Sequence, residues 1–266
     1  MSGLTLSCSG NPQGQPLVLV HGWGFTASAW DSWLPQLEND YAVTRVSLPG
    51  FGTDTALLED LNAAADALAT QLAAAGQSPA IWVGWSLGGQ LAAAVAARHP
   101  ALVQGLLTLG TNPCFVANGD WPGMSMTDFD SFYQGVRSTA AKTLGRFLML
   151  QGQGDSAAKQ VVRELKPALA TAVSTEALLA GLDRLAEDQR DFFAQLTQPR
   201  RFLFGAGDGL VPAAVAVQPM LAPYARVLAD CGHGLFLSAA EVVTTELCAL
   251  QQQVRTAVLM ELCDAG

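Results

Sequence analysis

A serine that could act as a nucleophile is the clearest chemical feature of the sequence. Ser86 lies between Gly84 and Gly88, each two residues away. Glycines at this spacing allow a tight strand-to-helix turn that lifts the serine hydroxyl toward a substrate carbonyl. The residues after Ser86 favour a helix, whose free N–H groups would stabilise a developing negative charge. We therefore expect Ser86 to attack an acyl group. The alternative is an ordinary glycine-rich turn.

A serine nucleophile needs a base, and a carboxylate must orient that base. His233 is the expected base, since neutral imidazole accepts a proton near neutral pH. Asp208, in a glycine-bearing loop after a predicted strand, is favoured as its partner over Asp230, which lies only three residues before His233. The order Ser86, Asp208, His233 differs from the orders in the two main serine protease types. These three residues are our expected catalytic triad.

The reaction also needs two N–H donors for the oxyanion. The glycine-rich segment 21–24 follows a predicted strand, and we expect the backbone N–H groups of Trp23 and Leu87 to be the donors. The other two histidines have weaker claims. His21 ends a strand and is expected to be structural, whereas His99 precedes a proline at a helix end and is expected to be exposed.

These residues follow short apolar runs that alternate with longer Ala-rich stretches, as in a parallel sheet with crossover helices. The predicted strands are 17–20, 43–48, 80–83, 106–109, 201–204 and 226–229, and the predicted helices are 63–75, 90–98 and 239–254. The tail after Val254 is compatible with a helix but has no evident role. The sequence predicts an α/β fold with a mostly parallel sheet and helices on both faces.

A long insertion separates the nucleophile from its acid. Ser86 and Asp208 are 122 residues apart, whereas one strand–helix–strand unit needs roughly 30. From about 113 to 196 the pattern is helical. We expect a core formed by 1–112 and 197–266, with a helical cap at 113–196 above Ser86.

The cap segment is cationic in an acidic chain. Between 132 and 166, two carboxylates accompany six cations: Arg137, Lys142, Arg146, Lys159, Arg163 and Lys166. Their helical spacing allows two cationic faces, which are either a solvated surface or a docking surface for an acidic partner. Phe147, Leu148, Met149 and Leu150 lie among them. These four side chains could line a pocket for an aliphatic acyl chain above Ser86, or simply pack the cap.

Composition excludes several classes of protein. The chain has 266 residues, half of them apolar and only 14% charged, which indicates a large core rather than disorder. The net charge of −9 has the wrong sign for a nucleic-acid or anionic-membrane binder. The five scattered cysteines and three histidines show no disulfide or metal-ligand spacing, and no secretory signal is visible. We expect a cytoplasmic protein, a monomer, without metal or cofactor.

Taken together, the motifs resemble those of the α/β-hydrolase superfamily. HGWG at 21–24 and the GxSxG turn are common to that superfamily. A more specific set is similar to the esterases that act on carrier-bound methyl esters in biotin synthesis: IWVGWSLGG at 81–89, NPCF at 112–115, DWPG at 120–123, RFL at 146–148 with LQ at 150–151, and DGLVP at 208–212. The resemblance covers nearly the whole chain, up to about Val254.

This resemblance implies hydrolysis of the methyl ester on a pimeloyl group carried by acyl-carrier protein. It places the catalytic residues at Ser86, Asp208 and His233 and the oxyanion donors at Trp23 and Leu87. Of these five residues, all except Asp208 are also expected to contact the substrate. It assigns acyl-chain contacts to Phe147, Leu148, Met149, Leu150 and Gln151. It assigns contacts with the phosphopantetheine arm and the acidic carrier to Lys142, Arg146, Lys159 and Arg163. The family has arginine where this chain has Lys142 and Lys159, so the charge is kept but bidentate phosphate contact is not expected there.

Two other functions stay open at this stage. The same triad could hydrolyse a free short-chain ester or a lactone. A ligand-binding module on a hydrolase scaffold would have no reactive serine. A serine at position 86 argues against dehalogenases and epoxide hydrolases of this fold, which use a carboxylate nucleophile.

Overall fold

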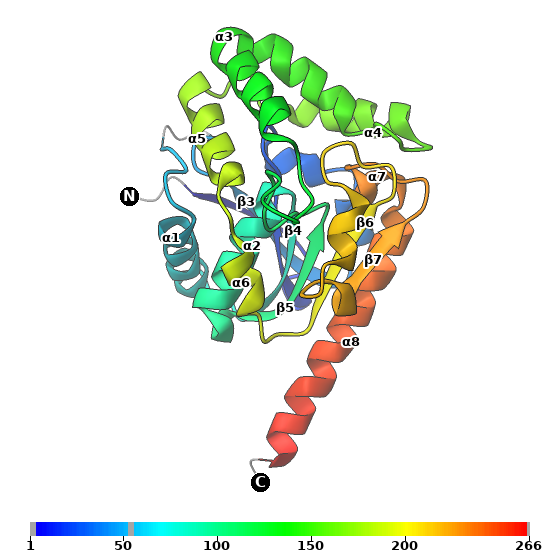
Figure 1. Ribbon diagram of the computed structural model, residues 1–266. Helices are drawn as coiled ribbons and strands as arrows, with labels where there is room; N and C mark the ends of the chain where they lie inside the picture. Colours follow the sequence, from blue (N-terminus) through cyan, green and yellow to red (C-terminus); the bar gives the residue numbers. More distant parts are fainter. Residues whose placement is uncertain (1–3, 53–55, 265–266) are drawn as a thin grey trace.

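One sheet forms the centre of the molecule (Figure 1). The computed structural model describes residues 4–52 and 56–264 of the chain. Within this part, seven strands pair in the order β1-β3-β2-β4-β5-β6-β7. They span Thr5–Gly10 (β1), Gln15–Val20 (β2), Tyr41–Ser47 (β3), Ala80–Trp85 (β4), Val103–Leu109 (β5), Arg200–Gly205 (β6) and Ala225–Leu228 (β7). Strands β2 to β7 run parallel to their neighbours, and β1 is antiparallel to β3. The predicted mostly parallel sheet is therefore confirmed.

Helices cover both faces of this sheet. The helix α1 spans Leu61–Ala74 and packs on α2 (Leu87–Arg98), and the helix α8 spans Ala240–Asp264. A Cβ on Gly84 would meet the backbone of α2, whereas a Cβ on Gly105 would meet Leu250 of α8. Gly84 pairs with Thr108, which lies three residues after Gly105 in β5, so Gly84 and Gly105 face opposite sides of the sheet. Because side chains alternate along a strand, α2 and α8 lie on opposite faces, as predicted.

Most of the helices between β5 and β6 lie over the ends of the central strands, whereas the last of them packs against α2 (Figure 1). They are α3 (Met126–Leu150), α4 (Ala158–Leu165), α5 (Thr175–Ala186) and α6 (Arg190–Ala194). Thr139 interrupts α3 with a non-helical backbone. Ser125 and Ser174 cap α3 and α5 through their hydroxyls. We retain 113–196 as the proposed cap.

Shorter helices lie between these elements. The helix α7 spans Leu235–Ser238, directly after the segment that contains His233. The 3-10 helices span Ala27–Trp30, Leu34–Gln36, Pro100–Leu102, Lys166–Ala168, Ala213–Val217 and Ala222–Tyr224. None of the helices in the described ranges 4–52 and 56–264 has the length and apolar character that crossing a bilayer requires.

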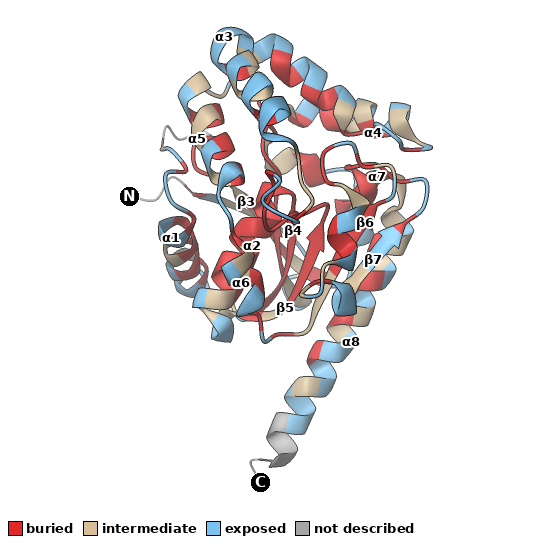
Figure 2. Cartoon of the chain, viewed as in Figure 1, coloured by how far each residue is buried: buried red, intermediate tan, exposed pale blue. Residues whose placement is uncertain are grey.

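The buried residues concentrate where the nucleophile turn begins (Figure 2). Every residue of β4 is buried, and so are the first ten residues of α2. This burial explains the uninterrupted apolar run at 80–83, because a central parallel strand is covered on both faces. The turn at Ser86 thus joins a fully buried strand to the buried start of a helix.

Candidate active site

The structure places Ser86 at a strained turn between β4 and α2. Its backbone angles are φ 55° and ψ −122°, and its side chain makes no capping bond to the helix. Holding a non-glycine residue in such a region costs about 1–3 kcal/mol, and residues held this way are common at active sites. A Cβ on Gly88 would lie 2.2 Å from the carbonyl oxygen of Val20, so only glycine fits there. This strained conformation is the one expected of a nucleophile turn, and Ser86 remains our predicted nucleophile.

The structure pairs His233 with Asp208. Nδ1 of His233 lies 2.7 Å from Oδ2 of Asp208, and both side chains are fully buried. The other carboxylate oxygen, Oδ1, accepts from the N–H groups of Leu210 and Val211 at 2.8 and 3.0 Å. An ionised carboxylate only accepts, so in the predicted triad the imidazole would carry its proton on Nδ1. Nε2 has no hydrogen-bond partner in the described part of the chain and is our predicted basic atom.

Backbone contacts bring this pair beside Ser86. The Ser86 N–H donates to the carbonyl of Leu109, whose neighbour Gly110 lies against the imidazole. A Cβ on Gly110 would be 3.0 Å from Nδ1 of His233 and 3.4 Å from Oδ2 of Asp208. Among the described residues no hydrogen bond joins Ser86 Oγ to His233 Nε2, so that contact stays a prediction.

The second candidate acid, Asp230, lies on the surface and not in the buried site. Asp230 is exposed and has φ 56°, in the left-handed region. Its carbonyl accepts from the N–H of Ser156. The geometry therefore favours Asp208 as the partner of His233.

The segment after β2 lies against the nucleophile. A Cβ on Gly22 would be 3.1 Å from Cβ of Ser86. Trp23 is anchored to the cap, because its indole N–H donates to the carbonyl of Leu178 at 2.8 Å. Leu87 is the first residue of α2, and such an N–H has no acceptor within its own helix. The Trp23 and Leu87 N–H groups remain our proposed oxyanion donors.

His21 has the geometry of a structural histidine. It is fully buried, with Nδ1 2.9 Å from the carbonyl of Gly22 and Nε2 accepting from the N–H of Leu48 at 3.1 Å. Burial lowers the pKa of His21 to about 4. Both ring nitrogens are therefore occupied in linking two loops, as we expected for a residue outside the proton-transfer chain.

The residues expected to contact the acyl chain do not share one environment. Phe147 and Leu148 are buried, and the Phe147 ring lies edge-on to Trp23 at 4.9 Å between centroids. Leu150 is half-buried, and Gln151 is buried with its amide N–H donating to the carbonyl of Phe147. Met149 differs from the expectation, because its side chain is 60% exposed. Successive residues of a helix point in different directions, so four adjacent side chains cannot all face inward.

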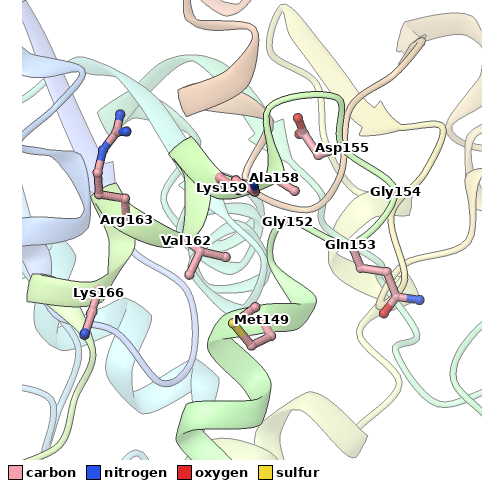
Figure 3. A pocket seen from close by; sticks show the side chains of 10 residues that line it. All are labelled: Met149, Gly152, Gln153, Gly154, Asp155, Ala158, Lys159, Val162, Arg163 and Lys166. Carbon is pink, nitrogen blue, oxygen red and sulfur yellow. The ribbon is translucent and has the colours of Figure 1, made fainter.

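Met149 instead borders an open groove of 630 Å³ between the end of α3 and α4 (Figure 3). Lys159 and Arg163 of α4 line the same groove, together with Lys166 of the 3-10 helix that follows α4. All three cations are exposed, and Arg163 also contacts the neighbouring Glu164 carboxylate at 3.6 Å. The cap therefore presents a groove that combines an apolar floor with positive charge.

Two further cations on α3 were expected to join this surface. Lys142 and Arg146 are both exposed, one helical turn apart. Arg146 lies three residues before Met149, so α3 carries positive charge close to the groove. The four proposed docking cations thus occupy solvent-facing positions on two neighbouring helices.

The described residues hold free thiols and no cluster of metal ligands. Cys8, Cys114, Cys231 and Cys248 are free, and Cys263 has its side chain outside the described part. No three His, Cys, Asp or Glu side chains gather in a metal-binding arrangement within that part.

The fold and the sequence have counterparts among known proteins. A model of the alpha/beta hydrolase fold family matches residues 15–240. The solved structure of an esterase from Exiguobacterium antarcticum aligns with a TM-score of 0.82 over 93% of this chain and 95% of that chain, at 20% identity. The chain belongs to the α/β-hydrolase family.

Sequence relatives narrow this class. A protein of Vibrio cholerae serotype O1 is 37% identical over 241 residues, which cover 88% of this chain and 93% of the relative. A protein of Edwardsiella ictaluri is 38% identical over 227 residues, 84% of each chain. Both are named pimeloyl-[acyl-carrier protein] methyl ester esterase. The chain is a member of this esterase family, as its motifs suggested.

Proposed function

We propose that this protein is a serine carboxylesterase that hydrolyses the methyl ester of pimeloyl-[acyl-carrier protein], releasing methanol and pimeloyl-[acyl-carrier protein]. The observation that carries the proposal is the buried His233–Asp208 pair at 2.7 Å beside the strained turn of Ser86. The names of the sequence relatives supply the substrate. The free cysteines in the described part suit a cytoplasmic location, which we propose as well.

In the proposed acylation step, Ser86 Oγ attacks the ester carbonyl while Nε2 of His233 takes its proton. The N–H groups of Trp23 and Leu87 hold the resulting oxyanion. When the carbonyl re-forms, the bond to the methoxy oxygen breaks, and His233 returns the proton to release methanol. Asp208 stabilises the transient imidazolium and keeps the proton on Nδ1.

Deacylation repeats these steps with water. His233 takes a proton from water as the hydroxyl attacks the acyl-enzyme carbonyl, and then returns a proton to Ser86 Oγ. The carboxylic acid formed loses its proton to the solvent and leaves with the carrier as a carboxylate. One water is consumed and one methanol released, so the proposed cycle is balanced without a cofactor.

We propose that the cap selects the carrier-bound substrate. Phe147, which is buried beside Trp23, and the buried Leu148 offer apolar surface for the acyl chain. Lys142, Arg146, Lys159 and Arg163 are exposed and would attract the acidic carrier and its phosphate-bearing arm. Charges of this kind act mainly on the rate of encounter and on specificity.

The test compares carrier-linked methyl pimelate with free dimethyl pimelate. Arg146→Glu with Arg163→Glu should lower kcat/KM at least tenfold for the carrier-linked ester at low salt and leave the free ester within twofold. Arg255→Glu, which reverses an exposed charge on α8, is the matched control and should affect neither. If the paired cap reversals changed neither rate, carrier docking on the cap would be wrong and a free ester or lactone would become the favoured substrate.

A further inference from the structure

The loop between α3 and α4, residues 151–157, belongs to the cap but contacts the segment of His233. The N–H of Gly232 donates to Oδ2 of Asp155 at 2.8 Å. The N–H of Gly234 donates to the backbone carbonyl of Gln151 at 3.1 Å. Both chain neighbours of His233 are therefore held by the same cap loop.

The Asp155 carboxylate is the centre of these contacts. It is buried, and it accepts from Gly232 N–H, from Ser238 Oγ at 2.6 Å and from Ala157 N–H at 2.7 Å. These donors come from the His233 segment, from α7 and from the residue that precedes α4. Hydrogen bonds to a charged acceptor are the stronger kind, and removing a buried acceptor leaves its donors unsatisfied. One side chain thus ties three elements together.

The same loop also lies against the segment of Asp208. A Cβ on Gly207 would be 2.2 Å from the carbonyl oxygen of Gly154, so the two backbones are in direct contact. A Cβ on Gly209 would lie 3.1 Å from the Gln153 side chain. The cap loop is therefore packed against both neighbours of Asp208, as well as against those of His233.

We propose that Asp155 is a positioning residue that sets the placement of the His233 imidazole through Gly232. The proposal rests on the proposed function, in which His233 is the base. The physical reason is that a shift of the base by about 1 Å can lower a rate roughly 100-fold. Asp155 also borders the cationic groove of Figure 3, so the cap segment next to a docked carrier is the segment that holds the base.

The test uses Asp155→Ala with Ser174→Ala as a matched control. The Ser174 hydroxyl accepts from Ala177 N–H at 3.1 Å at the start of α5. Its removal therefore weakens a helix of the proposed cap domain without touching the His233 segment. With p-nitrophenyl acetate, Asp155→Ala should lower kcat at least tenfold with KM within twofold, measured well below the unfolding temperature. The proton NMR signal of His233 Nδ1–H should shift or broaden in Asp155→Ala only.

The outcomes distinguish the positioning role of Asp155 from the proposed esterase function on which it rests. If Asp155→Ala kept kcat within twofold of Ser174→Ala and left the NMR signal unchanged, the positioning role would be overturned. If Asp155→Ala fails to fold, Asp155→Asn takes its place, with an expected kcat loss of at least threefold and the same NMR change. An unaltered kcat and signal in Asp155→Asn would overturn the proposal too. Failure of a fluorophosphonate to label Ser86 in the wild-type protein would instead reject the proposed function.

Discussion

Replacing Gly110 by alanine should displace the proposed base, His233, and so lower kcat by more than the accompanying loss of stability explains. Gly110 has φ +53°, and an added Cβ would be 3.0 Å from Nδ1 and 3.1 Å from Cε1 of His233. Ordinary contacts of a methyl group begin near 3.4 Å or beyond, so the imidazole must retreat by several tenths of an ångström. The same Cβ would lie 3.4 Å from Oδ2 of Asp208, which limits how the pair can rearrange.

The expected magnitudes differ for stability and catalysis. An alanine in the left-handed region costs about 1–2 kcal/mol in the free energy of unfolding. A displacement approaching 1 Å lowers a catalytic rate by up to about 100-fold. We therefore expect Gly110→Ala to lower kcat by about 10- to 100-fold, which corresponds to about 1.4–2.8 kcal/mol of activation free energy.

The chain offers a matched control at the end of α1. Gly76 has φ +66°, and nothing lies within 4 Å of a Cβ built there. Gly76→Ala should therefore show the same loss of stability in urea unfolding and keep kcat within twofold on a chromogenic ester. If Gly110→Ala matched Gly76→Ala in kcat, the reasoning that places the base against Gly110 would be refuted.

Three further substitutions test other parts of the account. His21→Gln should make the free energy of unfolding less sensitive to acid. In the wild type, the unfolded state binds a proton at His21 below pH 6.5, whereas the folded state binds one only near pH 4. The wild type therefore loses about 3 kcal/mol of unfolding free energy across that window. Urea unfolding at several pH values should show a correspondingly flatter acid limb in the variant. Asp208→Asn should lower kcat roughly 10³- to 10⁴-fold with little change in the unfolding midpoint, because an amide favours the wrong imidazole tautomer. Phe147→Ala should lower the free energy of unfolding by about 3 kcal/mol, because it opens a cavity beside Trp23, and should raise KM for the carrier-linked ester.

Each of these has a contradicting result. An unchanged acid limb in His21→Gln would show that this imidazole is not kept neutral by burial. Near-normal kcat in Asp208→Asn would remove Asp208 from the proposed triad. An unchanged KM in Phe147→Ala would remove that ring from the proposed acyl-chain contacts.

The sequence predicted the central strands and the turn residues because their signals are local. Strands such as β4 are covered on both faces, so each leaves an apolar run, and glycines mark the turn that follows. The paired acid and base could be predicted from residue type and order, since the carboxyl ends of parallel strands meet at one edge. Their 2.7 Å contact depends on two loops far apart in the chain.

Other features left no local signal. The strand β1 lies at the edge of the sheet and has no apolar run, so the sequence does not predict it, and it becomes a strand by pairing with β3. The helix α8 continues to Asp264, beyond the predicted end at 254, and Figure 1 shows it extending past the body of the molecule. The outward direction of Met149 depends on how α3 is rotated against the core. The contacts of the Asp155 carboxylate with Gly232 and Ser238, and of Gly110 with the His233 ring, join segments far apart in the chain, which residue types alone do not reveal.

The central claim is that Ser86 is a nucleophile activated by His233 and Asp208. Intact-mass and peptide-mapping measurements after brief exposure to a fluorophosphonate test it directly. The account predicts one adduct per chain, located on Ser86, that is absent in Ser86→Ala and forms at least 100-fold more slowly in His233→Ala. Labelling at another residue, or labelling of Ser86 at an unchanged rate without His233, would contradict it.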